Sequence, residues 1–394
     1  MASISTTDVI LGDIAGGGAC VARLPGNGAG RVVFVRGGIP GERVRVRLTD
    51  TSRQAWWQGV VEDVIEPSPD RVTPPCPVAG LCGGCDWQHI GLARQRELKA
   101  QIVAQQFARI AHLYIPVEVQ AVPGDQDGLA WRTRMRYLVA GDCLGLRAAG
   151  SHDMVPLPAG GCPLVAPGGP SDSQVLGIVG GRPIDEVGVT IASSGWSVWM
   201  PGGALLAGDM VMMQHADGRD YQVRADGFWQ VHPGAADRLV EAVTELSGVK
   251  QGDAAVDLYS GAGLFAGALV ARGAKVRGVE ANQRAVELAR RNVPEALFMA
   301  ARVEHAPWDD GPVDVAVLDP PRSGAGAAVV RRLAMRSTKS ITYVSCDPAS
   351  LARDIAVLAG EGYRLATLLA FDVFPMTPHV ECVAQLVPTV DLVG

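Results

Sequence analysis

From about residue 220 the sequence repeats one pattern, in which a short apolar run ends at a turn and a helical stretch follows. Three of these runs end at Asp257-Leu258-Tyr259-Ser260-Gly261, at Leu318-Asp319-Pro320-Pro321 and at Val344-Ser345-Cys346-Asp347-Pro348. Short apolar runs that alternate with helices are typical of parallel strands joined by right-handed crossovers. The pattern therefore predicts a doubly wound α/β domain over residues 220–394.

The turns after the strands of such a sheet meet at one edge, where ligands bind. Cys346 ends one strand, and the helix predicted to begin at Pro348 would offer N–H groups that favour a thiolate. A lone cysteine is more often a buried core residue. Asp319 follows a neighbouring strand, and the stiff pair Pro320-Pro321 would hold it over the same crevice. We therefore predict Cys346 as a nucleophile.

A glycine turn at Gly261 and Gly263 follows the first strand of this domain. Glycine lets the backbone approach a ligand closely, so both residues are predicted to contact a cofactor. The next strand ends at Glu280, and an acidic residue there can hold the two hydroxyls of a ribose. The third glycine of the dinucleotide fingerprint is missing, so the turn by itself indicates a nucleoside cofactor of some kind.

Four cysteines form a second pattern, with Cys76, Cys82 and Cys85 close together and Cys162 far downstream. Thiols in such a glycine- and proline-rich setting can hold an iron–sulfur cluster. Structural zinc is the chemical rival, because a site of four cysteines is ordinary for it. Disulfides are disfavoured, since we find no secretory segment and a cytosolic compartment keeps thiols reduced.

Two regions precede the α/β domain. Residues 1–66 alternate short β-rich runs with glycine turns, which predicts a small barrel of the oligonucleotide-binding (OB) type. Its arginines at 43, 45 and 47 fall on one face of a strand, suited either to RNA or to a solvated surface. Residues 67–219 form an α+β middle domain with the cysteines, in which Trp131–Tyr137 reads as an exposed strand for phosphates and stacked bases.

Composition limits the partners. The 394 residues are 48% hydrophobic and 19% charged, which is typical of a globular protein of two or three domains. We find no apolar stretch of the roughly 18 residues that span a bilayer, so we expect a cytoplasmic protein without membrane contact. The net charge of −6 disfavours indiscriminate binding to nucleic acid, so RNA would be met by local patches.

The ordered set of motifs resembles the S-adenosylmethionine-dependent RNA uracil-5-methyltransferases over nearly the whole chain. The motifs are Phe228–Val231, Asp257–Gly263, Glu280, Asp319–Arg322, Ser345–Asp354, Phe374-Pro375 and His379–Glu381. The resemblance implies a class I methyltransferase fold with an N-terminal TRAM domain. It also implies that Cys346 is the nucleophile, that Glu381 is the base, and that Gln230, Tyr259, Glu280 and Asp319 contact S-adenosylmethionine.

The cysteine spacing resembles that of the branch that acts on 23S ribosomal RNA, which implies a [4Fe-4S] cluster at Cys76, Cys82, Cys85 and Cys162, with zinc less favoured. Four protein ligands would leave no open iron, so the cluster would be structural or face RNA. The implied reaction is methyl transfer to uracil C5 through a covalent cysteine adduct at C6, by a monomer.

Two alternatives remain open. One is an enzyme that methylates transfer RNA, which the barrel and the cysteines disfavour. The other is a non-catalytic RNA-binding or maturation factor. Leu264, Arg302, Asp347 and His232 depart from the family pattern and leave the cofactor affinity open.

Overall fold

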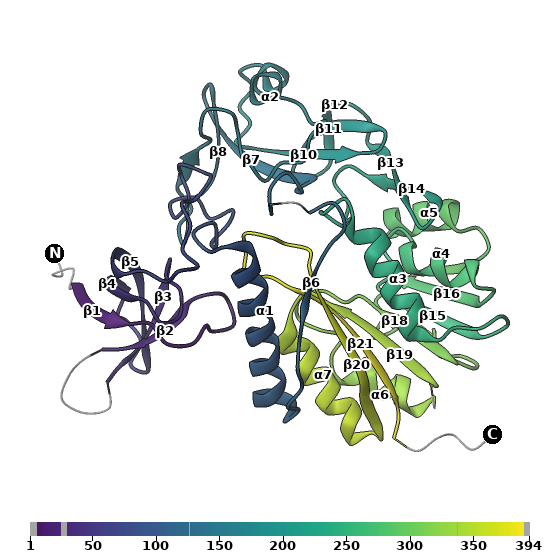
Figure 1. Cartoon of the computed structure of the whole chain (residues 1–394). Coiled ribbons are helices and arrows are strands. Elements are labelled where there is room, and N and C mark those ends of the chain that lie inside the picture. Colours follow the sequence, from purple (N-terminus) through teal and green to yellow (C-terminus); the bar gives the residue numbers. More distant parts are fainter. Residues whose placement is uncertain (1–5, 25–29, 126, 337, 390–394) are drawn as a thin grey trace. The chain divides into compact units, whose positions relative to one another are not determined.

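A computed structural model describes residues 6–24, 30–125, 127–336 and 338–389 (Figure 1). The chain divides into two compact units. The N-terminal unit comprises Met1–Ile102, Gly145–Pro163 and Phe374–His379, and the C-terminal unit comprises Val103–Leu144, Leu164–Val373 and Val380–Gly394. The predicted division into three domains, at residues 66 and 219, stays a prediction.

The N-terminal unit is built on a five-stranded sheet in the order β1-β4-β5-β3-β2, in which only β3 and β5 are parallel. Its strands are β1 (Thr6–Ile10), β2 (Cys20–Arg23), β3 (Val32–Arg36), β4 (Arg43–Asp50) and β5 (Trp56–Glu66). The core of this sheet also contains Trp87 and Ile90, which follow the three clustered cysteines. The β-rich runs predicted for residues 1–66 therefore form strands, and the cysteine-bearing segment packs onto them.

Strand β4 alternates as the sequence predicts. Val44 and Val46 are fully buried, whereas Arg43 and Arg45 point outward. Both arginines already have acidic partners, because Arg43 lies 3.3 Å from Glu66 and Arg45 lies 3.1 Å from Asp8. Their charge is thus largely compensated within the sheet.

The C-terminal unit contains an eight-stranded sheet in the order β17-β16-β15-β18-β19-β21-β20-β6 (Figure 1). The strands are β6 (Val119–Ala121), β15 (Ala254–Leu258), β16 (Lys275–Glu280), β17 (Leu297–Ala300), β18 (Val315–Leu318), β19 (Ser340–Ser345), β20 (Tyr363–Asp372) and β21 (Glu381–Pro388). Five neighbouring strands, β17 to β19 in this order, are parallel, whereas β21 is antiparallel to both neighbours. The predicted doubly wound sheet is confirmed, and β6 adds a strand from before residue 220.

The chain moves outward from β15 in one direction through β16 and in the other through β18, so the strand order reverses between β15 and β18. Right-handed crossovers then place α4 and α5 on one face of the sheet and α6 on the other, where it packs beside α7. The helices are α1 (Leu92–Gln106), the π-helical turn η1 (Phe107–Ala111), α2 (Asp172–Val179), α3 (Ala235–Ser247), α4 (Leu264–Ala271), α5 (Gln283–Asn292), α6 (Ala327–Met335) and α7 (Pro348–Gly360). In the described part of the chain, every helix is too short or too polar to cross a membrane.

A second group of strands precedes this sheet. It includes β7 (Arg134–Ala140), β8 (Cys143–Arg147), β9 (Met154–Pro156), β10 (Glu186–Ala192), β11 (Gly195–Met200) and β12 (Ala204–Ala207), followed by the hairpin of β13 (Val211–Ala216) and β14 (Arg219–Arg224). The prediction of an exposed strand at Trp131–Tyr137 is wrong for the two aromatic residues, because Trp131 and Tyr137 are only 4% exposed, whereas Arg136 is exposed. The Arg134 guanidinium is also buried, and it donates to the carbonyls of Ala225 and Gly227 at 3.0 and 2.5 Å.

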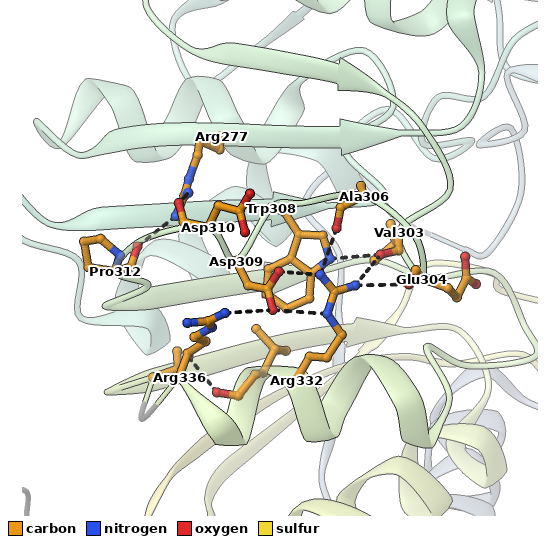
Figure 2. A network of polar contacts seen from close by, with 12 residues as sticks. Arg277, Val303, Glu304, Ala306, Trp308, Asp309, Asp310, Pro312, Arg332 and Arg336 are labelled. Atoms are coloured by element: carbon orange, nitrogen blue, oxygen red, sulfur yellow. Dashed lines mark hydrogen bonds and ion pairs between the residues drawn. The ribbon is translucent and has the colours of Figure 1, made fainter.

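A network centred on Arg332 of α6 holds the loop between β17 and β18 (Figure 2). The Arg332 guanidinium lies 4.5 Å from the ring centroid of Trp308 and donates to both carboxylate oxygens of Asp309. It also donates to the carbonyl of Ala306 at 2.8 Å. The loop begins where the Ala301 N–H donates to the Glu280 carbonyl at 2.9 Å, so the network anchors a segment that starts beside Glu280.

Candidate active site

The pairing of β19 with β21 brings Cys346 and Glu381 together. Ser345, the last residue of β19, is the partner of Cys382, and Cys346 and Glu381 directly adjoin this pair, so the two lie close together. Cys346 is half-buried, and Glu381, the first residue of β21, is 4% exposed. The predicted nucleophile and the predicted base are therefore neighbours.

The surroundings of Cys346 oppose its ionisation. Burial raises the pKa of its thiol to about 11, and the charges of Glu381 and Asp319 add to this effect. Arg322 acts in the opposite direction, through its charge and a hydrogen bond. The expectation that the helix N-terminus favours a thiolate stays a prediction, because burial and the neighbouring carboxylates outweigh such an effect in the free protein. Asp347 caps α7 by accepting the Ser350 N–H at 2.7 Å, so a carboxylate already occupies that end of the helix.

The two carboxyl groups of the site are also perturbed. Burial raises the pKa of Glu381 well above its usual range, the charge of Asp319 raises it further, and Arg322 opposes both. Burial likewise raises the pKa of Asp319, which directly follows β18. Neighbouring buried carboxyls cannot both ionise easily, so burial and Asp319 together make the Glu381 carboxylate more basic than an exposed one.

Arg322 is the residue of this site whose role the sequence analysis missed. It stands at the end of Asp319-Pro320-Pro321, in the loop after β18, and it influences both Cys346 and Glu381. Its place directly after the two prolines was the available signal, because a stiff loop fixes whatever follows it.

The glycine turn after β15 has a left-handed backbone at three positions. Tyr259, Gly261 and Gly263 all have positive φ, at 66°, 52° and 92°. The Gly261 N–H donates to the Glu280 carboxylate at 3.2 Å, and the Asn282 N–H donates to its other oxygen at 2.7 Å. A left-handed backbone at Tyr259 is unusual for a side chain of its size, which points to a constrained turn.

A cavity of about 150 Å³ opens beside this turn. Its lining includes Gly261, Ala262, Glu280, Asn282 and the side chain of Phe228, which is 71% exposed. Two of the predicted cofactor residues, Gly261 and Glu280, therefore share one cavity. The other four, Gln230, Tyr259, Gly263 and Asp319, lie outside its lining.

Asn282 is a residue that the sequence analysis missed at this edge. It caps α5 by accepting the Arg284 N–H at 3.0 Å, and it lies two residues after Glu280. An asparagine directly before a helix is a recognised start signal and could have been found.

Polar atoms with no partner in the described part of the protein gather at the same turn. They are the hydroxyls of Tyr259 and Ser260 and one carboxylate oxygen of Asp257. Burial raises the pKa of Asp257 to about 7. Buried polar groups normally have hydrogen-bond partners, so this turn fits a polar ligand such as a nucleoside cofactor.

The four cysteines predicted to bind a metal lie in the N-terminal unit as free thiols. Burial raises the pKa of Cys85 to about 12, and charges on Cys162, Cys82 and Cys76 raise it further, so all three lie near Cys85. The Cys82 sulfur accepts the Gly84 N–H at 3.4 Å. Among the described residues, however, no group of three or more cysteine, histidine or acidic side chains is arranged to hold a metal ion. The metal site stays a prediction.

Comparison with known families and proteins agrees with this geometry. A family model described as tRNA (Uracil-5-)-methyltransferase matches residues 300–388, a TRAM domain model matches residues 5–55, and a methyltransferase domain model matches residues 256–319. An uncharacterized RNA methyltransferase of Streptomyces avermitilis is 40% identical, over 97% of this chain and 98% of that protein. The 23S rRNA (uracil(1939)-C(5))-methyltransferase RlmD of Shewanella amazonensis is 31% identical, over 90% of both chains. The chain belongs to the RNA uracil-5-methyltransferase family.

The solved structure of Pyrococcus abyssi tRNA (uracil-54, C5)-methyltransferase, in complex with S-adenosyl-L-homocysteine, has the same fold. It matches with a TM-score of 0.75 and 24% identity, over 96% of this chain and 99% of that one. The predicted class I methyltransferase fold with an N-terminal TRAM domain is confirmed. So is the prediction of an S-adenosylmethionine-dependent enzyme of the RNA uracil-5-methyltransferase family.

Proposed function

We propose that this protein transfers a methyl group from S-adenosylmethionine to uracil C5 in 23S ribosomal RNA, through a covalent adduct between Cys346 and uracil C6. The observation that carries the proposal is the pairing of Ser345 with Cys382, which brings Cys346 and Glu381 close together, with Asp319 and Arg322 close enough to influence them. The 31% identity to a methyltransferase named for a 23S RNA uracil supports the ribosomal substrate.

The reaction needs both a nucleophile and a base, because uracil C5 is too poor a nucleophile to attack a methyl sulfonium unaided. The Cys346 sulfur adds to C6, and the electron pair that moves to C5 then takes the methyl group. The carboxylate of Glu381 removes the C5 proton, and the C6–sulfur bond breaks, which restores the ring double bond and the thiolate. The raised pKa of Glu381 makes it a stronger base than an exposed glutamate.

Arg322 and Asp319 set the electrostatics of this cycle. The Cys346 thiol first gives its proton to solvent water, and the cation of Arg322 stabilises the thiolate that remains. Asp319 raises the pKa of Glu381, and it thereby helps that carboxyl group hold the proton taken from C5.

S-adenosylmethionine supplies an electrophilic methyl group when it is bound. The residues proposed to hold it are Glu280 at the ribose, Gly261 and Gly263 through the turn, and Gln230, Tyr259 and Asp319 around them. The unpartnered hydroxyl of Tyr259 and the cavity beside Glu280 support this assignment.

The test is methyl transfer from labelled S-adenosylmethionine to 23S RNA, followed by mapping of the methylated nucleotide. Cys346→Ser should lower the rate at least about 100-fold, since loss of a covalent nucleophile costs several decades. Cofactor affinity should stay nearly unchanged. Cys143→Ser, a half-buried thiol far along the chain, is the matched control and should retain full activity. A Cys346→Ser variant that keeps more than a hundredth of the rate would refute the covalent mechanism.

We further propose that Cys76, Cys82, Cys85 and Cys162 bind a [4Fe-4S] cluster. Their grouping around Cys85 and the N–H donated to the Cys82 sulfur support this proposal. Protein purified without air should contain iron and sulfide in equal amounts, about four of each per chain. Cys85→Ala should lose both, whereas Cys143→Ser should keep both. One zinc per chain without iron would assign the site to zinc instead.

A further inference from the structure

The N-terminal sheet carries a second group of arginines that is distinct from the face of β4. Arg31 directly precedes β3, and Arg53 lies three residues before β5. Because β3 and β5 are parallel and Val32 is the partner of Trp56, the two arginines lie at the same end of the sheet. The Arg31 guanidinium donates to the Gln54 carbonyl, which ties it to the loop that carries Arg53. We call the group of Arg31, Phe34, Arg53, Trp56 and Trp57 the arginine–tryptophan rim.

Each arginine of the rim lies over an indole ring. The guanidinium carbon of Arg53 lies 4.5 Å from the ring centroid of Trp56, and that of Arg31 lies 4.6 Å from Trp57. Phe34 meets Trp56 edge to face, with ring centroids 5.5 Å apart. Consecutive residues of a strand point to opposite faces, so the end of β5 carries a stacked guanidinium on each face. Stacking fixes the planes of these cations in advance of any partner.

The charges of the rim differ from those of β4. Arg43 and Arg45 are paired with Glu66, Asp8 and Asp63. Among the described residues, Arg31 and Arg53 form no ion pair, and both are exposed. The Asp50 carboxylate accepts the Ser52 hydroxyl at 2.7 Å and is close enough to Arg53 to feel its charge, so it offsets part of the charge of the two arginines. The rim therefore keeps a positive charge in a chain whose net charge is −6.

We propose that the rim binds a single-stranded segment of the RNA substrate, with bases stacked on the Arg31 and Arg53 guanidinium planes and the phosphates beside them. Unpaired bases stack on aromatic rings and on arginine planes, whereas the bases of a duplex are not accessible for this. Of the residues that the sequence offered for this task, Trp131, Arg134 and Tyr137 are buried, and Arg43, Arg45 and Arg136 are paired with acids. The inference rests on the proposed function for its RNA substrate.

The test uses the full-length protein and a fluorescein-labelled, single-stranded oligouridylate of about 12 nucleotides, with anisotropy measured over a range of salt concentrations. Arg31→Gln/Arg53→Gln should weaken binding about tenfold, because loss of base stacking alone has an effect of this size. The slope of log affinity against log salt should become shallower by about 1.4, which corresponds to two phosphate contacts on a single strand. Arg43→Gln/Arg45→Gln is the matched control and should leave both quantities nearly unchanged.

A second variant separates stacking from charge and covers any loss of stability. Arg31→Lys/Arg53→Lys keeps both charges but not the planes, so it should keep the salt slope and lose affinity. Unchanged affinity in both rim variants, or an equal loss in the β4 control, would overturn the inference.

Methyl transfer is measured in parallel and separates the two proposals. If RNA binding depends on the rim but the protein methylates no RNA, the proposed function is refuted and the rim proposal is supported. If the protein methylates RNA but its RNA binding does not depend on the rim, only the rim proposal is refuted.

Discussion

The pKa of Cys346 can be measured directly, because alkylation of a cysteine by iodoacetamide proceeds through the thiolate. With a pKa of about 11, roughly one thiol in a thousand is ionised at pH 8, against about one in four for a free cysteine with a pKa of about 8.5. A more basic thiolate is also more nucleophilic, which offsets about tenfold of this difference. We therefore expect Cys346 to react roughly 20-fold more slowly than a free cysteine.

The pH profile of the alkylation rate is the decisive measurement. Restricted access to a half-buried thiol lowers the rate by the same factor at every pH and does not change the midpoint of the profile. Alkylation of Cys346, followed by peptide mass spectrometry in the free protein, should rise about tenfold per pH unit from pH 7.5 to 9.5 without levelling. Arg322→Gln should move the profile to higher pH, since it removes the cation that lowers the pKa. Glu381→Gln should move it to lower pH, since it removes a carboxylate that raises the pKa. A plateau reached by pH 8 would refute the burial argument and restore the helix terminus as the dominant influence.

Three further outcomes are expected. Glu381→Gln should accumulate RNA bound covalently to Cys346 that survives a denaturing gel, because adduct formation no longer leads to loss of the C5 proton; normal turnover would assign the base to another group. Arg332→Met should lower the free energy of unfolding by about 3 kcal/mol in chemical denaturation, because it leaves the buried Asp309 carboxylate without its cation. The control Arg331→Met removes an exposed ion pair and should lower the free energy of unfolding by less than about 1 kcal/mol. Equal losses in the two variants would contradict the role of the network in Figure 2. Glu280→Gln should weaken S-adenosylmethionine binding about tenfold by calorimetry through loss of a charged hydrogen bond to the ribose, and unchanged affinity would remove Glu280 from the cofactor site.

The positions of several site residues can be predicted from the local sequence, because these residues directly follow or end a strand. A strand followed by a glycine or proline turn places its last residues at the carboxyl edge of a parallel sheet, whatever the rest of the chain does. Cys346, Asp319 and Glu280 all lie at that edge, as predicted. The positive φ of Gly261 and Gly263 likewise follows from residue type and turn position.

Burial was less predictable. Trp131 and Arg134 read as exposed RNA contacts because their alternation is the same for a surface strand and for a covered one. Only the packing of neighbouring segments decides which face is covered, and here the Arg134 guanidinium meets the carbonyls of Ala225 and Gly227, about 90 residues away in the chain. The charge state of the β4 arginines depended in the same way on partners such as Asp8 and Glu66.

The sequence by itself therefore determined the class of fold, the order of the motifs and the edge of the sheet at which Cys346 lies, because these depend on periodicity and on turns. The tertiary structure alone decided the chemistry of that edge. Asp319 and Arg322 reach Cys346 from the loop after β18 and Glu381 reaches it from β21, and their opposing effects with burial set the pKa of its thiol. The sequence motif showed a helix start beside the thiol, but electrostatic energies depend on distance and solvent exposure, which chain order does not specify.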